Sequence, residues 1–442
     1  MTLNLALESS FLHRNCNFPV PFTNNSNKNS RKLNFPIIFA QFPNPKCNQE
    51  LLVVVGGGAA GIYGAIWAKT VAPKLNVIVI EKGQPLSKVK ISGGGRCNVT
   101  NGHCPDNVIM AEHYPRGNKE LKGSFFSMHS PLDTMSWFTS RGVKLKTESD
   151  GRVFPVSNSS SSIIDCLMTE ARKTGVSVQT GKTVTTATSK ATGKFDLGIK
   201  MHTSPTADLV EADYLLIATG SSKQGYGLAG QLGHTIIDPV PSLFTFKIKD
   251  SNLAELSGVA FSKVGPMLVT HWGLSGPAIL RLSAWSARDL YSSNYKGTLI
   301  LDFAPDLHIE EVKSILLKQK KNFAKQKVVN SSPSEFNLVK RFWRYLLKRE
   351  GLVEDILWAS ISSDALLAIT SLLKQCPFEV TGKGQFKDEF VTAGGIPLSE
   401  ILNVDGITGG FNFQNAWTGG YIAGTSIGDL AADRALKVQI LL

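Results

Sequence analysis

The feature that most constrains this sequence is a glycine turn between an apolar strand and an apolar helix. Leu51–Val55 is a run of strand-forming residues, and Ile62–Val71 is an apolar stretch of helical length. Between them Gly56, Gly58 and Gly61 stand in the spacing G-x-G-x-x-G. That spacing allows a tight turn, the close approach of a pyrophosphate to the backbone, and close packing of the helix on the strand. The stretch therefore predicts a Rossmann-like α/β unit that binds an adenosine dinucleotide.

A second strand after this helix ends in an acidic residue. Val77–Ile80 is apolar and β-branched, and Glu81 follows it. A carboxylate about twenty residues beyond the last glycine is where such folds bind the ribose hydroxyls. Ala60 in the turn and Lys82 beside the acid complete the predicted nucleotide contacts. A glycine-rich turn in an unrelated α/β protein is the alternative, and the flanking strands and helix argue against it.

Length and composition exclude several classes of protein. The 442 residues allow two or three folded units, and 42% hydrophobic and 19% charged residues are typical of a globular protein. No apolar run approaches the ~20 residues that span a bilayer. The six cysteines form no C-x-x-C pair and no metal-ligand cluster, so we expect reduced thiols and no metal. The sequence carries no signal for the oligomeric state.

The net charge of +12 permits an anionic partner. The first fifty residues contribute five basic and two acidic side chains, so most of the excess lies in the rest of the chain. Solvated lysines on a nucleotide-binding enzyme with a small-molecule substrate are the favoured explanation, and a nucleic-acid surface is the alternative.

Residues 1–48 have the composition of a targeting segment. They lack periodicity, contain almost no acid, and are rich in Asn and Ser with scattered Lys and Arg. We expect a transit peptide for the plastid stroma, because an Arg-rich amphipathic helix is missing. The mitochondrion is the alternative destination, and a disordered leader without a targeting role is the other alternative.

A second glycine-rich segment follows the nucleotide motif. Gly93–Gly95 precede Arg96, and consecutive glycines let backbone amides approach a ligand closely. Arg96 supplies a permanently charged fork for a phosphate or a flavin carbonyl. Asn98 and Asn101 are placed to orient a heterocycle. This segment is therefore predicted to contact the same ligand as the first turn.

Two side chains raise the question of chemistry beyond cofactor binding. Cys97 invites a redox role, but Cys104 stands at the wrong spacing for the motif of the disulfide reductases, so a structural thiol is favoured. His271, in the sequence Thr-His-Trp-Gly-Leu-Ser-Gly-Pro of residues 270–277, is the weak catalytic candidate. A structural, hydrogen-bonded histidine is the favoured alternative there.

The middle of the chain alternates between the two kinds of periodicity. Helices are expected at Pro131–Ser140 and Ser161–Thr174, and strands at Val176–Gln179, Thr183–Ser189 and Phe195–Met201 are expected to form a meander over the nucleotide domain. The apolar strand from Ala212 ends in Ala-Thr-Gly, which places Thr219 and Gly220 at the dinucleotide. Short strand-like runs follow up to Phe303, and lysine-rich helical sequence covers residues 306–375.

The C-terminal region again combines glycines with polar residues. Asp405 is predicted to contact the ribityl or phosphate region of the ligand, and Gly409 and Gly410 lie in the same motif as Gln414 and Asn415. A small-residue helix is expected at Tyr421–Ala435. Glycines ahead of a helix N-terminus are typical of backbone amides aimed at a polar heterocycle, here a flavin ring.

Four motifs in order carry a specific resemblance. They are residues 56–61 (Gly-Gly-Gly-Ala-Ala-Gly), 91–101 (Ile-Ser-Gly-Gly-Gly-Arg-Cys-Asn-Val-Thr-Asn), 270–277 (Thr-His-Trp-Gly-Leu-Ser-Gly-Pro) and 405–416 (Asp-Gly-Ile-Thr-Gly-Gly-Phe-Asn-Phe-Gln-Asn-Ala). Together they resemble the aminoacetone-oxidase-like FAD/NAD(P)-dependent oxidoreductase family of the BaiN type, over nearly the whole chain beyond the leader.

The resemblance implies an architecture and a cofactor. It implies a discontinuous Rossmann-like FAD-binding domain at 49–240 and 390–442, a β-barrel insert at 241–305 and 376–389, and a helical subdomain at 306–375. Carried over by motif, the FAD contacts are Gly56, Gly58, Gly61, Glu81, Arg96, Asn98, Thr219, Gly220, Asp405, Gly409, Gly410 and Asn415. A second G-x-G-x-x-G at Gly225–Gly230 lacks a flanking βαβ unit, so NAD(P)H is expected only as a transient electron donor.

Two departures from the family pattern qualify this expectation. The chain passes from Ile401 to Asp405 without a further strand that the family carries, and it is also shorter between Phe261 and Pro266. Both read as deletions, and the one before Asp405 is expected to weaken FAD binding. The leading function is hydride transfer between FAD and an organic substrate or NAD(P)H. The alternatives are an RNA-binding flavoprotein that uses the basic helical insert, and a weakly FAD-binding, non-catalytic isoform.

Overall fold

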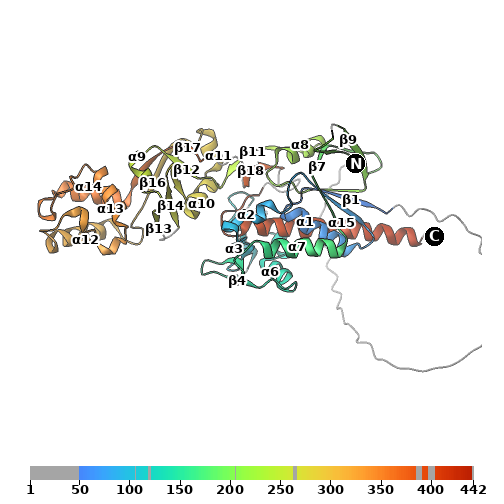
Figure 1. Ribbon diagram of the computed structural model, residues 1–442, viewed down its shortest axis with the longest axis horizontal. Coiled ribbons are helices and arrows are strands. Elements are labelled where there is room, and N and C mark those ends of the chain that lie inside the picture. The colour runs from blue at the N-terminus through green and yellow to red at the C-terminus, as the bar shows by residue number, and fades with distance from the viewer. Residues whose placement is uncertain are drawn as a thin grey trace, which may run out of the picture. The chain divides into compact units, whose positions relative to one another are not determined.

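The computed structural model describes residues 49–104, 106–117, 121–204, 206–261, 266–384, 391–396 and 404–440 (Figure 1). By its contacts the chain divides into Met1–Asn48 and Gln49–Leu442, and everything below concerns the second unit. The predicted leader and most of the two shortened segments, residues 262–265 and 397–403, lie outside the described residues.

A parallel sheet forms the centre of the nucleotide-binding region. Its strands stand in the order β10 (Tyr214–Ile217), β1 (Leu51–Val55), β2 (Asn76–Glu81) and β6 (Ser177–Thr180), and all three pairings are parallel. Helix α1 (Ala59–Val71) joins β1 to β2, which is the βαβ unit that the glycine turn predicts. The Rossmann-like α/β fold is therefore confirmed.

The two faces of this sheet are covered by different elements. Leu52 and Val54 of β1 belong to the core shared with α1, α7 (Ser161–Thr174) and Trp417 of α15 (Phe411–Ile440). Val53 and Val55 point to the other face, into a core with Val184, Leu197 and Leu228. Successive side chains of a strand alternate between faces, so one apolar run serves both layers. Figure 1 shows α1, α7 and α15 side by side on the helical face.

The expected meander is correct in kind and wrong in one strand. β6 pairs in parallel with β2, and the antiparallel meander consists of β7 (Lys182–Ser189), β8 (Phe195–Met201) and β9 (Ala207–Ala212). The physical reason lies in α7, which ends in left-handed Gly175 at φ +85°. A strand that follows a crossover helix returns parallel to the sheet.

Several short elements lie between the principal ones. In the nucleotide-binding region they are α2 (Ser87–Gly95), β3 (Thr100–Asn101), α3 (Asn107–Ala111), α5 (Phe125–Met128), α6 (Pro131–Thr139), β4 (Leu145–Thr147), β5 (Arg152–Pro155) and α8 (Lys223–Gln231). β3, β5 and β4 form a small antiparallel sheet in that order.

The chain enters and leaves the insert through two paired strands, β11 (Ile237–Ser242) and β18 (Val391–Gly395), which run antiparallel. The insert sheet has the order β13-β14-β15-β12-β17-β16, and every pairing in it is antiparallel. No pairing of β13 with β16 is found within the described ranges, so a closed barrel stays a prediction. The strands are β12 (Phe246–Ile248), β13 (Ala260–Phe261), β14 (Met267–Thr270), β15 (Gly273–Ser275), β16 (Gly297–Leu301) and β17 (Cys376–Lys383).

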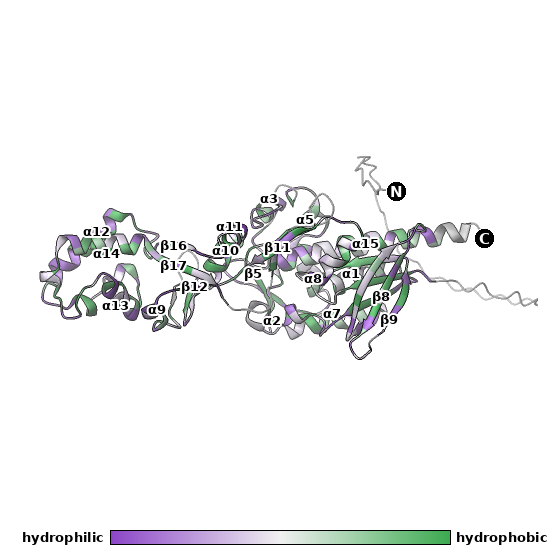
Figure 2. Cartoon of the chain, turned by 90° about the horizontal axis from the view of Figure 1, so that it is seen from above, coloured by the Kyte–Doolittle hydropathy of each residue, from purple (hydrophilic) through white to green (hydrophobic). Residues whose placement is uncertain are grey.

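Helices of the insert pack on this sheet through one continuous core. They are α9 (Ser251–Ala254), α10 (Pro277–Trp285), α11 (Ala287–Ser292), α12 (Ile309–Asn322), α13 (Lys340–Arg349) and α14 (Ser363–Lys374). Phe378 of β17, Phe303, Trp343 and Leu346 belong to the same buried cluster. Figure 2 shows apolar residues along the strands and helices of this part. The domain boundaries given above stay predictions.

The last helix begins ten residues earlier than expected. α15 starts at Phe411 rather than Tyr421, so Gly419 and Gly420 lie within the helix and not ahead of it. The structural reason is close packing on α1, because a Cβ at Gly420 would stand 2.7 Å from the carbonyl oxygen of Ala60. Gly409 and Gly410 remain the residues that precede the helix.

None of the helices within the described ranges is long and apolar enough to cross a membrane. A search of the same ranges finds no cluster of three or more His, Cys, Asp or Glu side chains that could hold a metal ion.

Candidate functional site

The glycine turn joins the ends of three neighbouring strands. Gly56 has φ +107° and donates its N–H to the carbonyl of Ile80 at 2.9 Å. A Cβ at Gly56 would stand 2.5 Å from the carbonyl oxygen of Ala218, and one at Gly61 would stand 1.9 Å from that of Gly56. These two glycines are therefore required by the fold itself.

Gly58 is different, because nothing in the described structure occupies the space beside it. It is the N-cap of α1, it lacks a capping side chain, and a Cβ built on it meets no atom within 4 Å. The first turn of α1 also contains no acidic residue. The partial positive charge and free amides of a helix N-terminus favour an anion there. Ala60 lies half-buried in that first turn.

Glu81 closes the same turn from the end of β2. Its Oε2 accepts the N–H of Gly57 and its Oε1 accepts the N–H of Gly83, both at 2.7 Å. Each carboxylate oxygen keeps a second lone pair that can accept a hydroxyl proton. The neighbouring Lys82 side chain is exposed. Glu81 is thus fixed at the position where the sequence predicts a ribose contact.

The second glycine segment has an unusual backbone. Gly93, Gly94 and Gly95 all have positive φ, at +56°, +70° and +83°. The guanidinium of Arg96 lies 3.9 Å from the centre of the Phe154 ring and donates to Glu148 at 2.7 Å. The β4–β5 hairpin therefore holds Arg96, and its charge is already paired with a carboxylate.

Cys97 and Asn98 are buried beside this segment. Burial raises the pKa of the Cys97 thiol to about 12, so the thiol is protonated at neutral pH and does not act as a thiolate. Asn98, oriented with its amide oxygen toward Gly410, accepts that residue's N–H at 2.8 Å and donates to the carbonyl of Thr100 at 3.0 Å. The structural role that the sequence favours for Cys97 stays a prediction, as does its contact with the cofactor.

The structure brings two segments together that are three hundred residues apart. Thr100 donates to Gln414 at 2.7 Å, and Asn101 donates to the carbonyl of Gly409 at 3.1 Å. A Cβ at Gly410 would stand 2.4 Å from the carbonyl carbon of Thr100. The positive φ of Gly409, +133°, and of Gly410, +97°, allows this contact. Both segments predicted to face a flavin ring therefore adjoin each other.

Asp405 has a role that the sequence does not predict. Its side chain is fully buried, forms an ion pair with Arg116, and accepts the hydroxyl of Ser242 at 2.7 Å. These bonds make Asp405 an internal anchor, and its contact with the ribityl or phosphate region stays a prediction. The sequence gives no signal for this anchor, because Arg116 lies in an irregular segment without a motif.

Gln414 and Asn415 differ in their available hydrogen bonds. The Gln414 amide is fully buried and donates to the carbonyl of His129 and to Thr418, both at 3.0 Å, in addition to accepting from Thr100. It is therefore an internal link, and its contact with the cofactor stays a prediction. In contrast, Oδ1 of Asn415 is buried without any partner in the described structure. A buried polar atom without a partner is costly, and a bound ligand would satisfy it.

Thr219 and Gly220 follow the end of β10 next to the first turn. The N–H of Ala218 donates to the carbonyl of Val55 at 2.8 Å, and Gly220 has φ +58°. A Cβ at Gly225 would stand 1.7 Å from Oγ1 of Thr219, so α8 packs directly on this strand end. The glycines of residues 225–230 lie inside α8 and do not form a second dinucleotide turn.

His271 does not join these segments. It is exposed at the turn between β14 and β15, and its ring contacts that of Trp272 at 4.2 Å. The glycines of its motif have structural roles, since a Cβ at Gly273 would stand 2.1 Å from the carbonyl oxygen of Phe246. No contact of His271 with the glycine segments is found in the part of the chain that the structure describes.

A buried polar cluster behind α1 escapes sequence reasoning altogether. The Tyr63 hydroxyl and Nε2 of His129 lie 2.9 Å apart, and the imidazole stacks on Tyr421 with centroids 4.6 Å apart. Burial lowers the pKa of His129 to about 4. His129 is thus neutral at physiological pH. No sequence motif predicts this cluster, because its members come from three separate parts of the chain.

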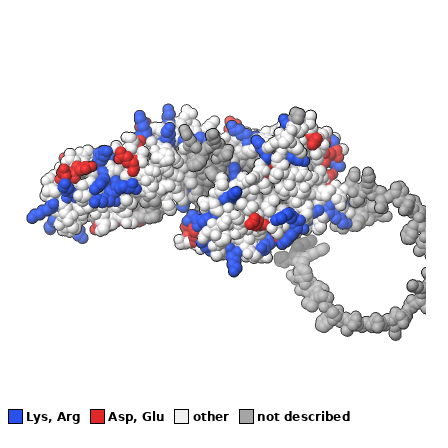
Figure 3. All heavy atoms as spheres, in the orientation of Figure 1, with Lys and Arg blue, Asp and Glu red and all other residues white. Residues whose placement is uncertain are grey.

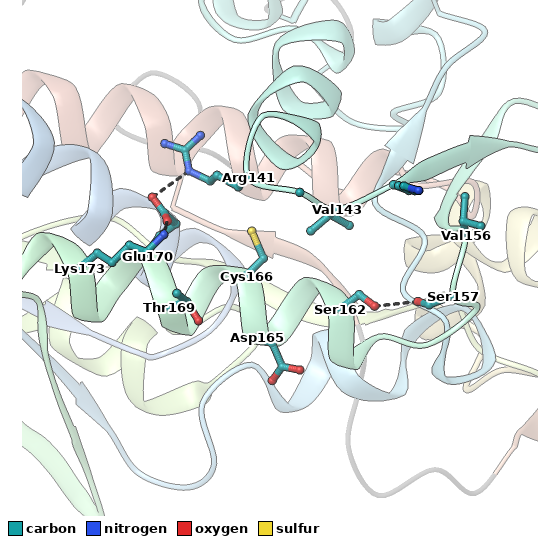
Figure 4. Close-up of a pocket in the computed structure, with 12 residues that line it drawn as sticks. Arg141, Val143, Val156, Ser157, Ser162, Asp165, Cys166, Thr169, Glu170 and Lys173 are labelled. Carbon is teal, nitrogen blue, oxygen red and sulfur yellow. Dashed lines mark hydrogen bonds and ion pairs between the residues drawn. The ribbon is translucent and has the colours of Figure 1, made fainter.

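A shallow cavity of about 490 Å³ lies along α7 (Figure 4). Three of its charged groups are paired, with Glu170 accepting from Arg141 at 3.0 Å and from Lys173 at 2.9 Å. Ser157 and Ser162 are hydrogen-bonded to each other at 2.7 Å. None of the predicted cofactor contacts lines it, so it is distinct from the glycine segments.

Comparison with known proteins identifies the family. Residues 50–426 match the family described as HI0933-like protein Rossmann domain. A 3-dehydro-bile acid delta(4,6)-reductase of Clostridium scindens is 26% identical over 416 residues, which cover 84% of this chain and 97% of the relative. A ribosomal RNA dihydrouridine synthase of Haemophilus influenzae is 25% identical over 422 residues, which cover 85% and 98%.

Among solved structures, the open conformation of a flavocytochrome c3 fumarate reductase has 14% sequence identity and a TM-score of 0.44, over 86% of this chain and 79% of that one. The family match covers most of the chain, and it confirms the resemblance drawn from the four motifs. The chain belongs to the HI0933-like Rossmann flavoprotein family, to which BaiN and the aminoacetone-oxidase-like proteins are related, and it is an FAD-dependent oxidoreductase.

Proposed function

We propose that this enzyme transfers a hydride between FAD and an organic substrate, with NAD(P)H as a transient electron donor. The observation that carries the proposal is the contrast within the first glycine turn. Gly56 and Gly61 are closed by protein atoms, whereas the space beside Gly58 is open at the N-terminus of α1. Packing therefore explains the glycines at positions 56 and 61 but not the glycine at position 58. A pyrophosphate bound at the N-terminus of α1 would explain it, because a side chain there would block the approach of the phosphates.

The other predicted contacts fit the rest of the cofactor. Glu81 would hold the adenosine ribose, since its carboxylate is fixed by two backbone N–H groups. The flavin end would meet the segments around Asn98 and Gly410, where Oδ1 of Asn415 has no partner among the described residues. When bound, FAD supplies a two-electron carrier, and the chain's own residues bind and orient it.

Anaerobic titration of the purified protein with NADH, NADPH and candidate organic substrates tests this function. Bleaching of the flavin absorbance by one of them is the expected result. Heating the protein and identifying the released flavin checks the cofactor. Release of FMN in place of FAD would contradict the proposal, because Glu81 would have no adenosine ribose to bind.

A second candidate is oxidation or reduction of a base in RNA. One relative is named for ribosomal RNA, and residues 306–375 of this chain carry twelve Lys and Arg against eight Asp and Glu. Phosphate contacts weaken steeply with salt, so RNA binding that falls steeply as salt rises separates this candidate from a small-molecule enzyme. For either substrate the proposed location is the plastid stroma, on the composition of residues 1–48.

A further inference from the structure

The exposed side of α13 consists of basic residues alone. Lys340, Arg341, Arg344 and Lys348 are all exposed, and at 3.6 residues per turn they occupy an arc of about 100°. The opposite side of the helix is buried in the core of the insert, through Phe342, Trp343, Leu346 and Leu347. The core therefore fixes which way the four cations point.

No carboxylate of the described residues forms an ion pair with these four charges. No ion pair of α13 is found within the described ranges. Arg344 donates to the Asn330 amide at 3.4 Å, and Lys348 donates to that of Asn252 at 2.8 Å. Both acceptors are uncharged.

Helices α12 and α7, in contrast, carry acidic as well as basic residues. Lys313 of α12 pairs with Glu310, and Lys173 of α7 pairs with Glu170. A solvated helix with ordinary patterning mixes both signs in this way. On a helix face that carries only positive charges, the side chains repel one another until a bound anion neutralises them.

Arg349, the remaining cation of α13, has a structural role. It donates to the carbonyl of Pro377 and to the Tyr345 hydroxyl, and its guanidinium lies 5.0 Å from the centre of the Phe378 ring. It fastens α13 to β17. The other four cations of α13 make no comparable bond to the sheet within the described ranges, so packing does not explain them.

We infer that this basic face of α13 binds the phosphate backbone of an RNA. Lys340, Arg344 and Lys348 recur every four residues, so they line up about 6 Å apart along the helix axis and can follow one strand. Arginine and lysine at such a face bind phosphates without reading the sequence, and they position the nucleic acid for a separate site. Figure 3 shows Lys and Arg side chains on this part of the insert, with Asp and Glu side chains beside them.

This inference rests on the second candidate function, and it names the surface that would hold the RNA. The test uses the full chain with FAD bound and a fluorescein-labelled RNA hairpin of mixed sequence. The variant K340A/R341A/R344A removes three charges from a helix surface where alanine is well tolerated. The matched control K74A/K200A/K296A removes three exposed lysines that lie outside α13.

We expect the wild type and the control to bind the hairpin equally, with affinity that falls as salt rises. In the α13 variant the slope of log affinity against log salt should shrink by about 2–3, since each of the three phosphate contacts contributes about 0.7 on the single-stranded loop and about 0.9 on the duplex stem. FAD content and reduction by NAD(P)H should stay at the wild-type level in all three proteins.

Equal losses in the control and the α13 variant would overturn the assignment to this face. Absence of salt-dependent binding in the wild type would overturn RNA as the partner, while intact flavin reduction would leave the oxidoreductase proposal standing. Binding to phosphatidylglycerol vesicles in place of the hairpin would also overturn it, in favour of a membrane surface.

Discussion

At the scale of single residues, the glycine turn contains one glycine that we expect to matter for cofactor binding and others that the fold requires. A Cβ at Gly58 enters open space, so Gly58→Val should leave the fold intact and block the approach of the pyrophosphate. We expect FAD affinity to fall on the order of a hundredfold or more. Isothermal titration with FAD measures it, and the urea midpoint of the apo protein reports the fold. Unchanged affinity would place the pyrophosphate elsewhere.

Gly61→Ala is the matched control for that experiment. Its Cβ would stand 1.9 Å from the carbonyl oxygen of Gly56, and neither backbone segment can move without disturbing β1 or α1. We expect a loss of stability of about 3 kcal/mol or more, seen as a lower urea midpoint already in the apo protein. A Gly61→Ala protein as stable as the wild type would contradict the close packing of this turn.

His129 gives a prediction for pH. Its pKa is lowered to about 4 in the fold, below the ordinary value of 6.5, because burial disfavours the charged ring. The unfolded chain therefore binds the proton more strongly, and stability should fall as pH drops from 6.5 toward 4, by on the order of 3 kcal/mol from this residue. His129→Gln keeps a hydrogen-bond partner for Tyr63 and does not titrate.

Urea unfolding at several pH values measures this effect. The wild type should lose stability over that window more steeply than His129→Gln. Identical pH profiles would show that folding does not change the pKa of His129, because Asp133 and the other acid-sensitive groups are present in both proteins.

At the scale of elements, α1 and α15 meet along glycines. A Cβ at Gly424 would stand 2.2 Å from the carbonyl oxygen of Gly64, and one at Gly428 would stand 2.6 Å from Cβ of Val71. Gly424→Ala should therefore cost about 1–3 kcal/mol by overpacking, although alanine is the better helix former.

Gly230→Ala in α8 is the control for that substitution. The position is exposed and helical, and its Cβ would meet no atom within 4 Å. We expect a gain of up to about 1 kcal/mol there, from the higher helix propensity of alanine. Thermal melts of the two variants should move in opposite directions, and a stabilised Gly424→Ala would contradict the close contact.

The elements that the sequence predicts well are those with local signals. α7 begins and ends as predicted because its amphipathic period and Gly175 define it locally. The start of α15 was missed because glycine is a poor helix former in isolation, and only contact with α1 makes Gly420 favourable inside a helix. The same glycines recur at residues 420, 424 and 428, and that four-residue spacing was a readable signal of close helix packing.

At the scale of the whole molecule, the first glycine turn is readable from sequence and the long-range anchors are not. Gly56, Gly58 and Glu81 lie within one βαβ unit, so their spacing in the sequence predicts that they lie close together in the fold. The ion pair of Arg116 with Asp405 joins residues almost three hundred positions apart. Such a pair depends on how the chain returns from the insert, which a single sequence does not encode in any local pattern.

Removal of the leader belongs to this scale as well. Cleavage should fall before Glu50, because Tyr214 donates to the Glu50 carboxylate at 3.2 Å and β1 begins at the next residue. A protein starting at Gln49 should fold and bind FAD like the full chain. Mass spectrometry of the protein isolated from plastids measures the new N-terminus, and an intact Met1 would contradict targeting to that compartment.

We expect the shortened return from the insert to weaken the binding of FAD. Seven residues, 397–403, separate Ile396 from Val404. At ~3.4 Å per residue, the segment from Glu400 to Val404 spans about 17 Å, which suffices for one short strand or one connection and not for both. We expect this chain to bind FAD more weakly than a version that carries the additional strand.

Local contacts of the C-terminal motif could hold it in place without the additional strand. Asp405 is paired with Arg116, Gly406 donates to Asn412 at 2.9 Å, and Ile407 donates to the carbonyl of His113 at 3.0 Å. If these anchors alone fix Gly409 and Gly410, the additional strand is dispensable. FAD dissociation constants of this chain and of a version with the additional strand, measured side by side, decide between the two. A larger dissociation constant for this chain would show that the strand contributes to FAD binding, and equal constants would show that the anchors suffice.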